Sequence, residues 1–129
     1  MKKIIATLAC AIIAASTAFA GEYEDISITE LKEKIKAKEV VVLDVNGSAS
    51  YKKGHIPSAV DFRANKDTLA KHLPEQKDVL VVAYCGGPSC SAYKAAANAA
   101  AELGYTNVKH LSAGISGWLQ AGEGTEKAE

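Results

Sequence analysis

The sequence predicts an α/β protein in which helices cover both faces of a parallel β-sheet. Two continuous apolar runs, VVVLD at 40–44 and VLVVAY at 79–84, predict the sheet, because a strand that is buried on both faces needs apolar residues at nearly every position. Helix-forming segments alternate with the strand candidates along the chain. This alternation favours right-handed crossovers between parallel strands.

The N-terminal half begins with a short alternating segment at 25–28, which predicts a strand. A helix is expected at 30–38, and the hydroxyl of Thr29 is a candidate to accept a hydrogen bond from a free amide at its start. After the first apolar strand, the turn-rich segment 47–57 has room for one helical turn around Tyr51.

The C-terminal half continues the alternation of strands and helices. The expected segments are a short strand at 59–62, a helix at 65–73, the strand at 79–84, a helix at 91–103 and a strand at 107–111. Pro74 ends the first of these helices and Gly104 provides the C-cap of the second. A short helix carrying Trp118 follows, and we expect the polar tail at 122–129 to fray.

Residues 1–20 have the three parts of a secretory signal peptide. Lys2 and Lys3 give a positive start, an apolar stretch too short to span a bilayer comfortably follows, and AFA at 18–20 fits a cleavage site. The alternative is a membrane anchor that stays attached. We expect cleavage, which leaves one domain at 21–129 in an exported, periplasmic protein without stable membrane association.

The charge of the chain argues against two classes of partner. The sequence has 15 basic and 15 acidic residues, and the predicted leader removes two lysines but no acidic residue. The remaining domain is slightly acidic and has no basic block, which argues against nucleic acid or an anionic membrane as partner.

Cleavage would leave two cysteines, Cys85 and Cys90, because Cys10 lies in the leader. An even count in an oxidising compartment suggests a structural disulfide. A bridge across so short a loop, however, gains little denatured-state entropy compared with one that spans the domain. The pair therefore indicates chemistry, and the sequence leaves both a disulfide and free thiols open.

Cys85 stands at the carboxyl end of the most apolar strand, where open α/β sheets bind their ligands. A thiol is nucleophilic as its thiolate, which needs surroundings that favour negative charge. Gly86 and Gly87 can reach positive φ and turn their amides inward, and a helix beginning near Ser91 points its positive end at the loop. The pattern predicts an activated nucleophile beside an anion site. The alternative is a buried cysteine that only packs.

Three stretches resemble the family of single-domain rhodanese-like sulfurtransferases. They are VVLDVNGSASYKKGHIPSAVDF at 41–62, VVAYCGGPSCSAYKAA at 81–96 and AELGYTNVKHLSAGISGW at 101–118, in the family's order. The resemblance implies a five-stranded parallel sheet with helices on both faces. It also implies that a cysteine takes a sulfane sulfur from a donor such as thiosulfate and passes it, as a persulfide, to cyanide or a thiol. It implies no metal or organic cofactor and does not identify a protein partner.

The resemblance also assigns the site. Cys85 is the catalytic residue that forms the persulfide. The substrate-binding loop consists of Gly86, Gly87, Pro88, Ser89, Cys90 and Ser91. Related phosphatases and arsenate reductases have a loop one residue longer that ends in arginine, so this loop argues against phosphatase activity.

Two departures from the family concern substrate binding. Many members carry an arginine or another polar residue at the position of Cys90, and many carry arginine at the position of Asn46. Bidentate guanidinium contacts hold multi-oxygen anions well, so their absence weakens the case for thiosulfate as the donor. The loop amides, Ser89, Ser91 and Lys94 are then the groups expected to bind the donor.

Cys90 has three interpretations that the sequence leaves open. Its thiolate could attack a Cys85 persulfide, releasing sulfide and leaving a disulfide. The two cysteines could form a dithiol–disulfide couple that exchanges with a partner. Cys90 could also be a small apolar residue that fills the base of the loop. A catalytically silent domain that only binds a partner is the remaining alternative for the whole protein.

Other polar residues are expected to be structural. Asp44 is predicted to fix neighbouring backbone, and His55 to be a turn histidine bonded to backbone rather than a general base. His72 and His110 have no partners at metal-ligand spacing, which argues against a metal site.

Overall fold

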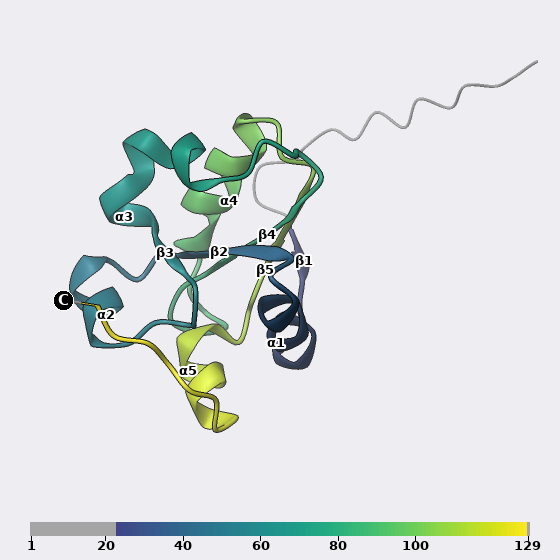
Figure 1. Ribbon diagram of the computed structural model, residues 1–129. Coiled ribbons are helices and arrows are strands. Elements are labelled where there is room, and N and C mark those ends of the chain that lie inside the picture. The colour runs from purple at the N-terminus through teal and green to yellow at the C-terminus, as the bar shows by residue number, and fades with distance from the viewer. Residues whose placement is uncertain (1–22, 129) are drawn as a thin grey trace, which may run out of the picture.

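The computed structural model describes residues 23–128, and the predicted signal peptide lies outside them. Its centre is a five-stranded sheet in the order β1-β5-β4-β2-β3, with every neighbouring pair parallel. The strands are β1 Glu24–Asp25, β2 Val40–Asp44, β3 Val60–Asp61, β4 Leu80–Tyr84 and β5 Asn107–His110. Helices lie on both faces of this sheet (Figure 1), which confirms the predicted class.

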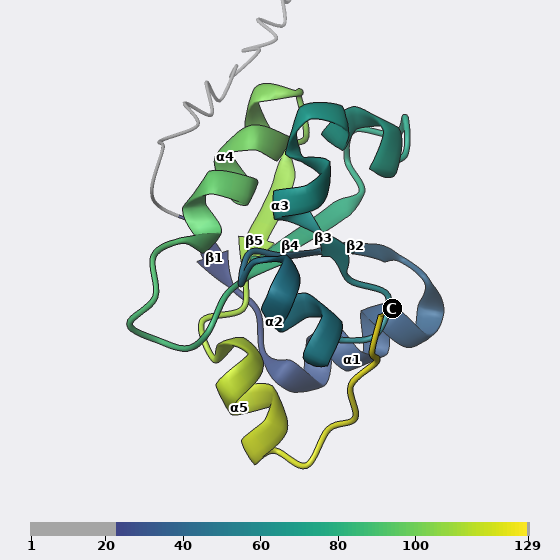
Figure 2. The same ribbon diagram turned by 90° about the vertical axis from the view of Figure 1, so that its left-hand side faces the viewer.

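The helices form one layer on each side of the sheet (Figures 1 and 2). One layer contains α3 Phe62–Asn65, the 3-10 helix η1 Lys66–His72 and α4 Tyr93–Glu102. The other contains α1 Ile28–Ala37, α2 Ser48–Lys53 and α5 Gly114–Gln120. Among the described residues, none of the helices has the length and apolar character that a bilayer span requires.

The central strands β2 and β4 pair along their whole length, with Val42 opposite Val82. All five residues of β4 are buried. Alternate side chains of β4 join different cores: Val81 and Ala83 pack with α4, whereas Val82 packs with α1 and α5. This two-sided burial explains why the strand sequence is continuously apolar.

The first helix differs from the prediction, because it begins at Ile28 and its cap is Ser27. The hydroxyl of Ser27 accepts a hydrogen bond from the amide of Glu30 at 3.0 Å. Serine followed three residues later by glutamate is a capping signal, and it draws Ile28 into the helix instead of the strand. The predicted cap at Thr29 and the predicted strand at 25–28 are therefore wrong in their bounds.

The predicted helix at 65–73 is instead two short elements. Asp61 caps α3 through the amide of Ala64, so the helix begins directly after β3. The following η1 turns are broken at Thr68, whose φ of −127° is not helical. The helix predicted at 91–103 begins two residues later, at Tyr93, and Gly104 follows its end with φ +99° as expected for a C-terminal glycine.

The prediction that the tail frays is wrong. His55 and Glu126 exchange two backbone hydrogen bonds of 2.9 Å, and the indole of Trp118 donates to the carbonyl of Gly124 at 2.8 Å. The tail thus crosses from α5 to α2, where the chain ends in Figure 1. These bonds replace the water contacts that a free tail would make, so the tail belongs to the folded domain.

Candidate active site

Cys85 directly follows β4, as predicted, and only 3% of its surface is exposed. Its backbone is held by the start of α5. The amide of Ile115 donates to the carbonyl of Cys85, and the amide of Ser116 to that of Gly86, both at 3.0 Å. The connection from β4 to α4 bows outward beside α5 in Figure 2. One helix end thus fixes the backbone from which the thiol projects.

Gly114 makes this contact possible, and the sequence analysis missed it. Its φ is +63°, and a Cβ added there would lie 2.6 Å from the carbonyl carbon of Gly86 and from the nitrogen of Gly87. Real side chains do not approach backbone so closely, so only glycine fits. The available signal was a glycine at the start of a short helix that follows the last strand.

The loop closes through a turn at residues 87–90. The amide of Cys90 donates to the carbonyl of Gly87 at 3.0 Å. Pro88 occupies the second position of this turn, where its fixed φ is favourable. The expectation that Gly86 and Gly87 adopt positive φ is wrong: in residues 23–128 the positive-φ glycines are Gly47, Gly104, Gly114 and Gly122. The loop reverses at Pro88 and Ser89, so the preceding glycines need no special backbone conformation.

Four N–H groups of the loop, those of Gly86, Gly87, Ser89 and Ser91, donate no hydrogen bond to a partner within residues 23–128. Pro88 and Ser89 are exposed, as is Ser91, which precedes α4. Backbone N–H groups beside the amino end of a helix stabilise negative charge.

Cys85 and Cys90 are joined by a disulfide, with their Cα atoms 6.3 Å apart. Cys85 is buried, whereas Cys90 is partly exposed and packs at the border of the same apolar cluster. Of the two states that the sequence left open, the structure therefore contains the bridged one.

Few positively charged side chains lie near the cysteine loop. Asn46, which stands where many relatives have arginine, places its side-chain oxygen 3.8 Å from where a Cβ on Gly86 would lie. The guanidinium of Arg63 reaches the neighbouring Gly47, with Nη1 4.0 Å from its added Cβ. Arg63 is the single arginine of the sequence, and the sequence analysis did not select it.

Asp44 is the last residue of β2, and its carboxylate bonds to the chain at the carboxyl ends of the strands, next to the site. Its carboxylate accepts hydrogen bonds from the amide of Asn46 at 2.7 Å and from the hydroxyl of Tyr84 at 2.5 Å. That hydroxyl in turn accepts from the amide of Ile56 at 3.0 Å. Burial raises the pKa of Asp44, although its two hydrogen bonds act in the opposite direction, and burial followed by the Asp44 charge raises the pKa of Tyr84. This agrees with the structural role predicted for Asp44.

His55 is bonded to backbone, as expected. Nδ1 of His55 contacts the carbonyl of Tyr51 at 2.8 Å, and the two rings stack. His110 stacks on Tyr93, and its buried Nδ1 has no partner in residues 23–128. Burial lowers the pKa of His110, although the charge of Asp25 acts in the opposite direction; the charge of Lys94 adds to the lowering. Across residues 23–128 there is no group of three or more His, Cys, Asp and Glu residues that could hold a metal ion.

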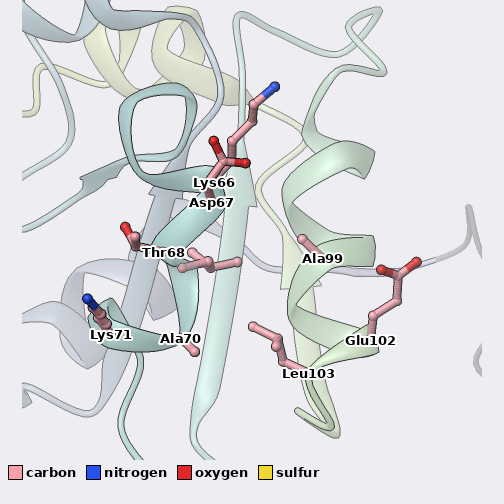
Figure 3. Close-up of a pocket in the computed structure, with 9 residues that line it drawn as sticks. Lys66, Asp67, Thr68, Ala70, Lys71, Ala99, Glu102 and Leu103 are labelled. Atoms are coloured by element: carbon pink, nitrogen blue, oxygen red, sulfur yellow. The ribbon is translucent and has the colours of Figure 1, made fainter.

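A separate groove of about 560 Å³ lies between η1 and α4 (Figure 3). Ala99 of α4 and Leu103, which directly follows this helix, point toward it, and Lys66 and Lys71 lie on its other side. The groove is near the carboxyl end of α4, whereas the cysteine loop precedes the amino end of that helix. Ten helical residues span about 15 Å, so the groove is not part of the cysteine site.

Comparison with known proteins identifies the domain. The model of the rhodanese-like domain family matches residues 27–121. The thiosulfate sulfurtransferase GlpE of Shewanella oneidensis is 29% identical over 104 residues, which cover 78% of this chain and 97% of that protein. An HTH-type transcriptional regulator of Mycobacterium tuberculosis is 34% identical over 116 residues, covering 89% of this chain; the match spans half of the regulator's length.

A solved structure agrees with this result. The thiosulfate sulfurtransferase from Pseudomonas aeruginosa superposes with a TM-score of 0.67 at 27% identity, covering 86% of this chain and 21% of that one. Together with the strand order described above, the match confirms the rhodanese-like fold.

Proposed function

The chain belongs to the family of rhodanese-like domains, and on this premise we propose that Cys85 carries sulfur as a persulfide. Its relatives support a sulfurtransferase-type role. In the proposed reaction a sulfane sulfur moves from a donor such as thiosulfate to a thiophilic acceptor, either cyanide or a thiol. The observation that carries this proposal is the position of Cys85 at the end of β4, followed by a loop whose Gly86, Gly87 and Ser89 N–H groups donate to no partner within residues 23–128.

The chemistry follows from the loop. In the reduced protein the Cys85 thiolate attacks the outer sulfur of thiosulfate, and sulfite leaves with the electron pair of the broken sulfur–sulfur bond. The amides of Gly86, Gly87 and Ser89 are available to stabilise the thiolate and then the outer sulfur of the persulfide. An acceptor attacks that outer sulfur and regenerates the thiolate. No proton has to be removed during the transfer if the thiolate is already formed.

The donor must also be recognised as an anion. Neither Asn46 nor Cys90 provides the guanidinium that many relatives have there. Arg63 is the cation that we propose in its place, because its guanidinium reaches Gly47, next to Asn46. Lys94, in the first turn of α4, is a second candidate. A guanidinium binds a multi-oxygen anion better than an ammonium group does.

We also propose that the protein acts in the periplasm after removal of residues 1–20. The support is the sequence pattern described above: a lysine-containing start, a short apolar stretch and AFA at 18–20. Mass spectrometry of the protein recovered from a periplasmic extract tests both parts, and a mass that includes the leader would contradict cleavage.

The enzyme assay combines thiosulfate with cyanide and follows thiocyanate, using protein that has been reduced and then freed of reductant. We expect Cys85→Ser to abolish the transfer and Cys90→Ser to keep most of it. Intact mass of Cys90→Ser should show the gain of one sulfur atom, which cyanide reverses and which is absent when Cys85→Ser is combined with it. If neither the reduced wild-type protein nor Cys90→Ser gains sulfur or releases sulfite with thiosulfate, or gains sulfur from other sulfane donors, the proposed function fails.

The disulfide favours a second candidate, a thiol–disulfide redox module that needs both cysteines. Either single serine variant should then lose all activity in dithiol exchange, and sulfur transfer should be absent throughout. A domain that only binds a partner would instead tolerate the loss of either cysteine.

A further inference from the structure

We propose that Cys90 is a resolving thiol that discharges the Cys85 persulfide inside the loop and releases its outer sulfur as hydrogen sulfide. The Cys85–Cys90 disulfide seen in the structure is then the product state of a catalytic turnover. This inference rests on the proposed persulfide of Cys85 and adds the fate of its sulfur. It gives the protein a further activity, the reduction of sulfane sulfur at the expense of a dithiol.

The loop geometry brings the two sulfur atoms together. The two Cα atoms are 6.3 Å apart, within the usual range for a disulfide. The hydrogen bond from the Cys90 amide to the Gly87 carbonyl folds the second half of the loop back over the first. Pro88 restricts that turn, so the approach of Cys90 is largely preorganised.

Burial favours the internal thiol over an external one. Cys85 is only 3% exposed, and its side chain belongs to the apolar cluster under α4. A bulky thiol from solution would have to approach a sulfur atom that is almost completely buried in this cluster. Cys90 already packs against the same cluster. Holding two reacting groups in contact gives effective molarities of up to about 10⁵–10⁸ M, far above the concentration of any free thiol.

The resolving step balances in atoms and electrons. Cys90 attacks Sγ of Cys85, the bond between the two cysteine sulfurs forms, and the bond from Sγ of Cys85 to the outer sulfur breaks. The outer sulfur leaves with that electron pair as sulfide and takes up the proton of the Cys90 thiol, giving HS⁻. The two cysteines are together oxidised by two electrons, and the outer sulfur is reduced by two electrons. The free amides of Gly86, Gly87 and Ser89 can stabilise the departing charge.

A dithiol reductant returns the loop to its starting state. Its first thiolate attacks Cys90, the more exposed of the two residues, and releases Cys85 as a thiolate beside the loop amides. Its second thiol resolves the mixed disulfide and leaves Cys90 as a thiol. The net reaction converts thiosulfate and a dithiol into sulfite, HS⁻, a disulfide and a proton.

The experiment is a single turnover without external thiol. Protein carrying Cys10→Ser, so that Cys85 and Cys90 are its only cysteines, is reduced, freed of reductant under anaerobic conditions and mixed with thiosulfate. Sulfide and sulfite are measured in solution, and intact mass is measured on the protein. We expect one equivalent each of sulfite and sulfide and a protein that has lost two hydrogens. Cys90→Ser and Cys90→Ala should release sulfite, keep the extra sulfur and release less than about one tenth of the sulfide, because the preorganised attack is lost.

A matched control restores the number of thiols at the wrong place. Gln76 is exposed in the turn before β4, at the opposite end of that strand from Cys85. Adding Gln76→Cys to Cys90→Ser should leave the persulfide in place and release no sulfide. If that variant releases sulfide as fast as the wild type does, a thiol far from Cys85 suffices and the role of Cys90 is refuted.

The outcomes separate the two proposals. If the wild type gains and keeps one sulfur atom without releasing sulfide, the resolving role is wrong and the persulfide proposal stands. If Cys90→Ser releases sulfide like the wild type, the resolving role is also wrong. If neither the wild type nor the Cys90 variants gain sulfur or release sulfite, the persulfide proposal itself fails and the resolving role fails with it.

Discussion

Replacing Gly114 with alanine tests whether the start of α5 holds the cysteine loop. Gly114 has a φ of +63°, and its added Cβ would lie 2.6 Å from backbone atoms of Gly86 and Gly87. The left-handed conformation costs an L-residue about 1–2 kcal/mol. Overpacking typically costs about 1–3 kcal/mol, and backbone cannot rotate away as a side chain can. We therefore expect a loss of roughly 2–5 kcal/mol in the free energy of unfolding.

Gly122 provides the matched control for this substitution. Its φ is +80°, but no heavy atom lies within 4 Å of its added Cβ. Gly122→Ala should therefore cost only the conformational part, about 1–2 kcal/mol. Urea unfolding of both variants measures the difference.

The same substitution should impair chemistry in the folded protein. The clash moves the backbone that receives hydrogen bonds from Ile115 and Ser116, and with it the position of Cys85. We expect the rate of sulfur transfer by Gly114→Ala to fall at least about tenfold, because small misplacements of reacting groups are costly. The assay is run without urea, at a temperature where the variant is folded. Equal stability losses at Gly114 and Gly122, with unchanged transfer in both, would refute the packing argument.

Four further predictions follow from the described contacts. Tyr84→Phe removes the hydroxyl shared by Asp44 and the Ile56 amide, and urea unfolding should show a loss of about 2–4 kcal/mol because buried polar groups lose their partners. Arg63→Gln should raise the KM for thiosulfate with little change in kcat, and an unchanged KM would exclude Arg63 from donor binding. Burial lowers the pKa of His110, so the unfolded chain binds its proton first as the pH falls below about 6.5; the free energy of unfolding should decline from there, and His110→Phe should remove that part of the pH dependence. Truncation after residue 124 removes the two backbone hydrogen bonds between Glu126 and His55 and should lower the midpoint of urea unfolding. An unchanged midpoint would mean that the tail adds no stability.

The sequence predicted most accurately the strands that are buried on both faces. The strand predicted at 40–44 is observed with the same bounds, and β4 starts one residue after its predicted start, because strands buried on both faces need apolar residues at every position. The helix bounds at Ile28 and Tyr93 were less accurate, since they depend on a cap and on a turn. The tail was misjudged because its backbone bonds leave no compositional trace.

The same distinction holds within the site. The position of Cys85 followed from the strand that precedes it, because a sheet exposes its ligand edge at the carboxyl ends of the strands. Gly114 and Arg63 could not be found in this way. Each acts through contact with a segment far away in the sequence, and no local pattern says which loop such a residue will meet.

The absence of a clamping arginine and the presence of Cys90 have a common consequence. With Arg63 reaching only Gly47 and no arginine at position 46 or 90, the loop has little cationic charge with which to hold an anionic donor. Cys90 instead gives the persulfide a route that needs no second small molecule. That route is open because Cys90 is already bonded to Cys85 in the structure. Substituting Cys90→Arg should therefore exchange one property for the other. We expect a lower KM for thiosulfate and thiocyanate formation at least as fast as in the wild type, together with loss of sulfide release in the single-turnover assay. An arginine variant that still releases one equivalent of sulfide would show that the residue at position 90 does not choose between these two fates of the sulfur.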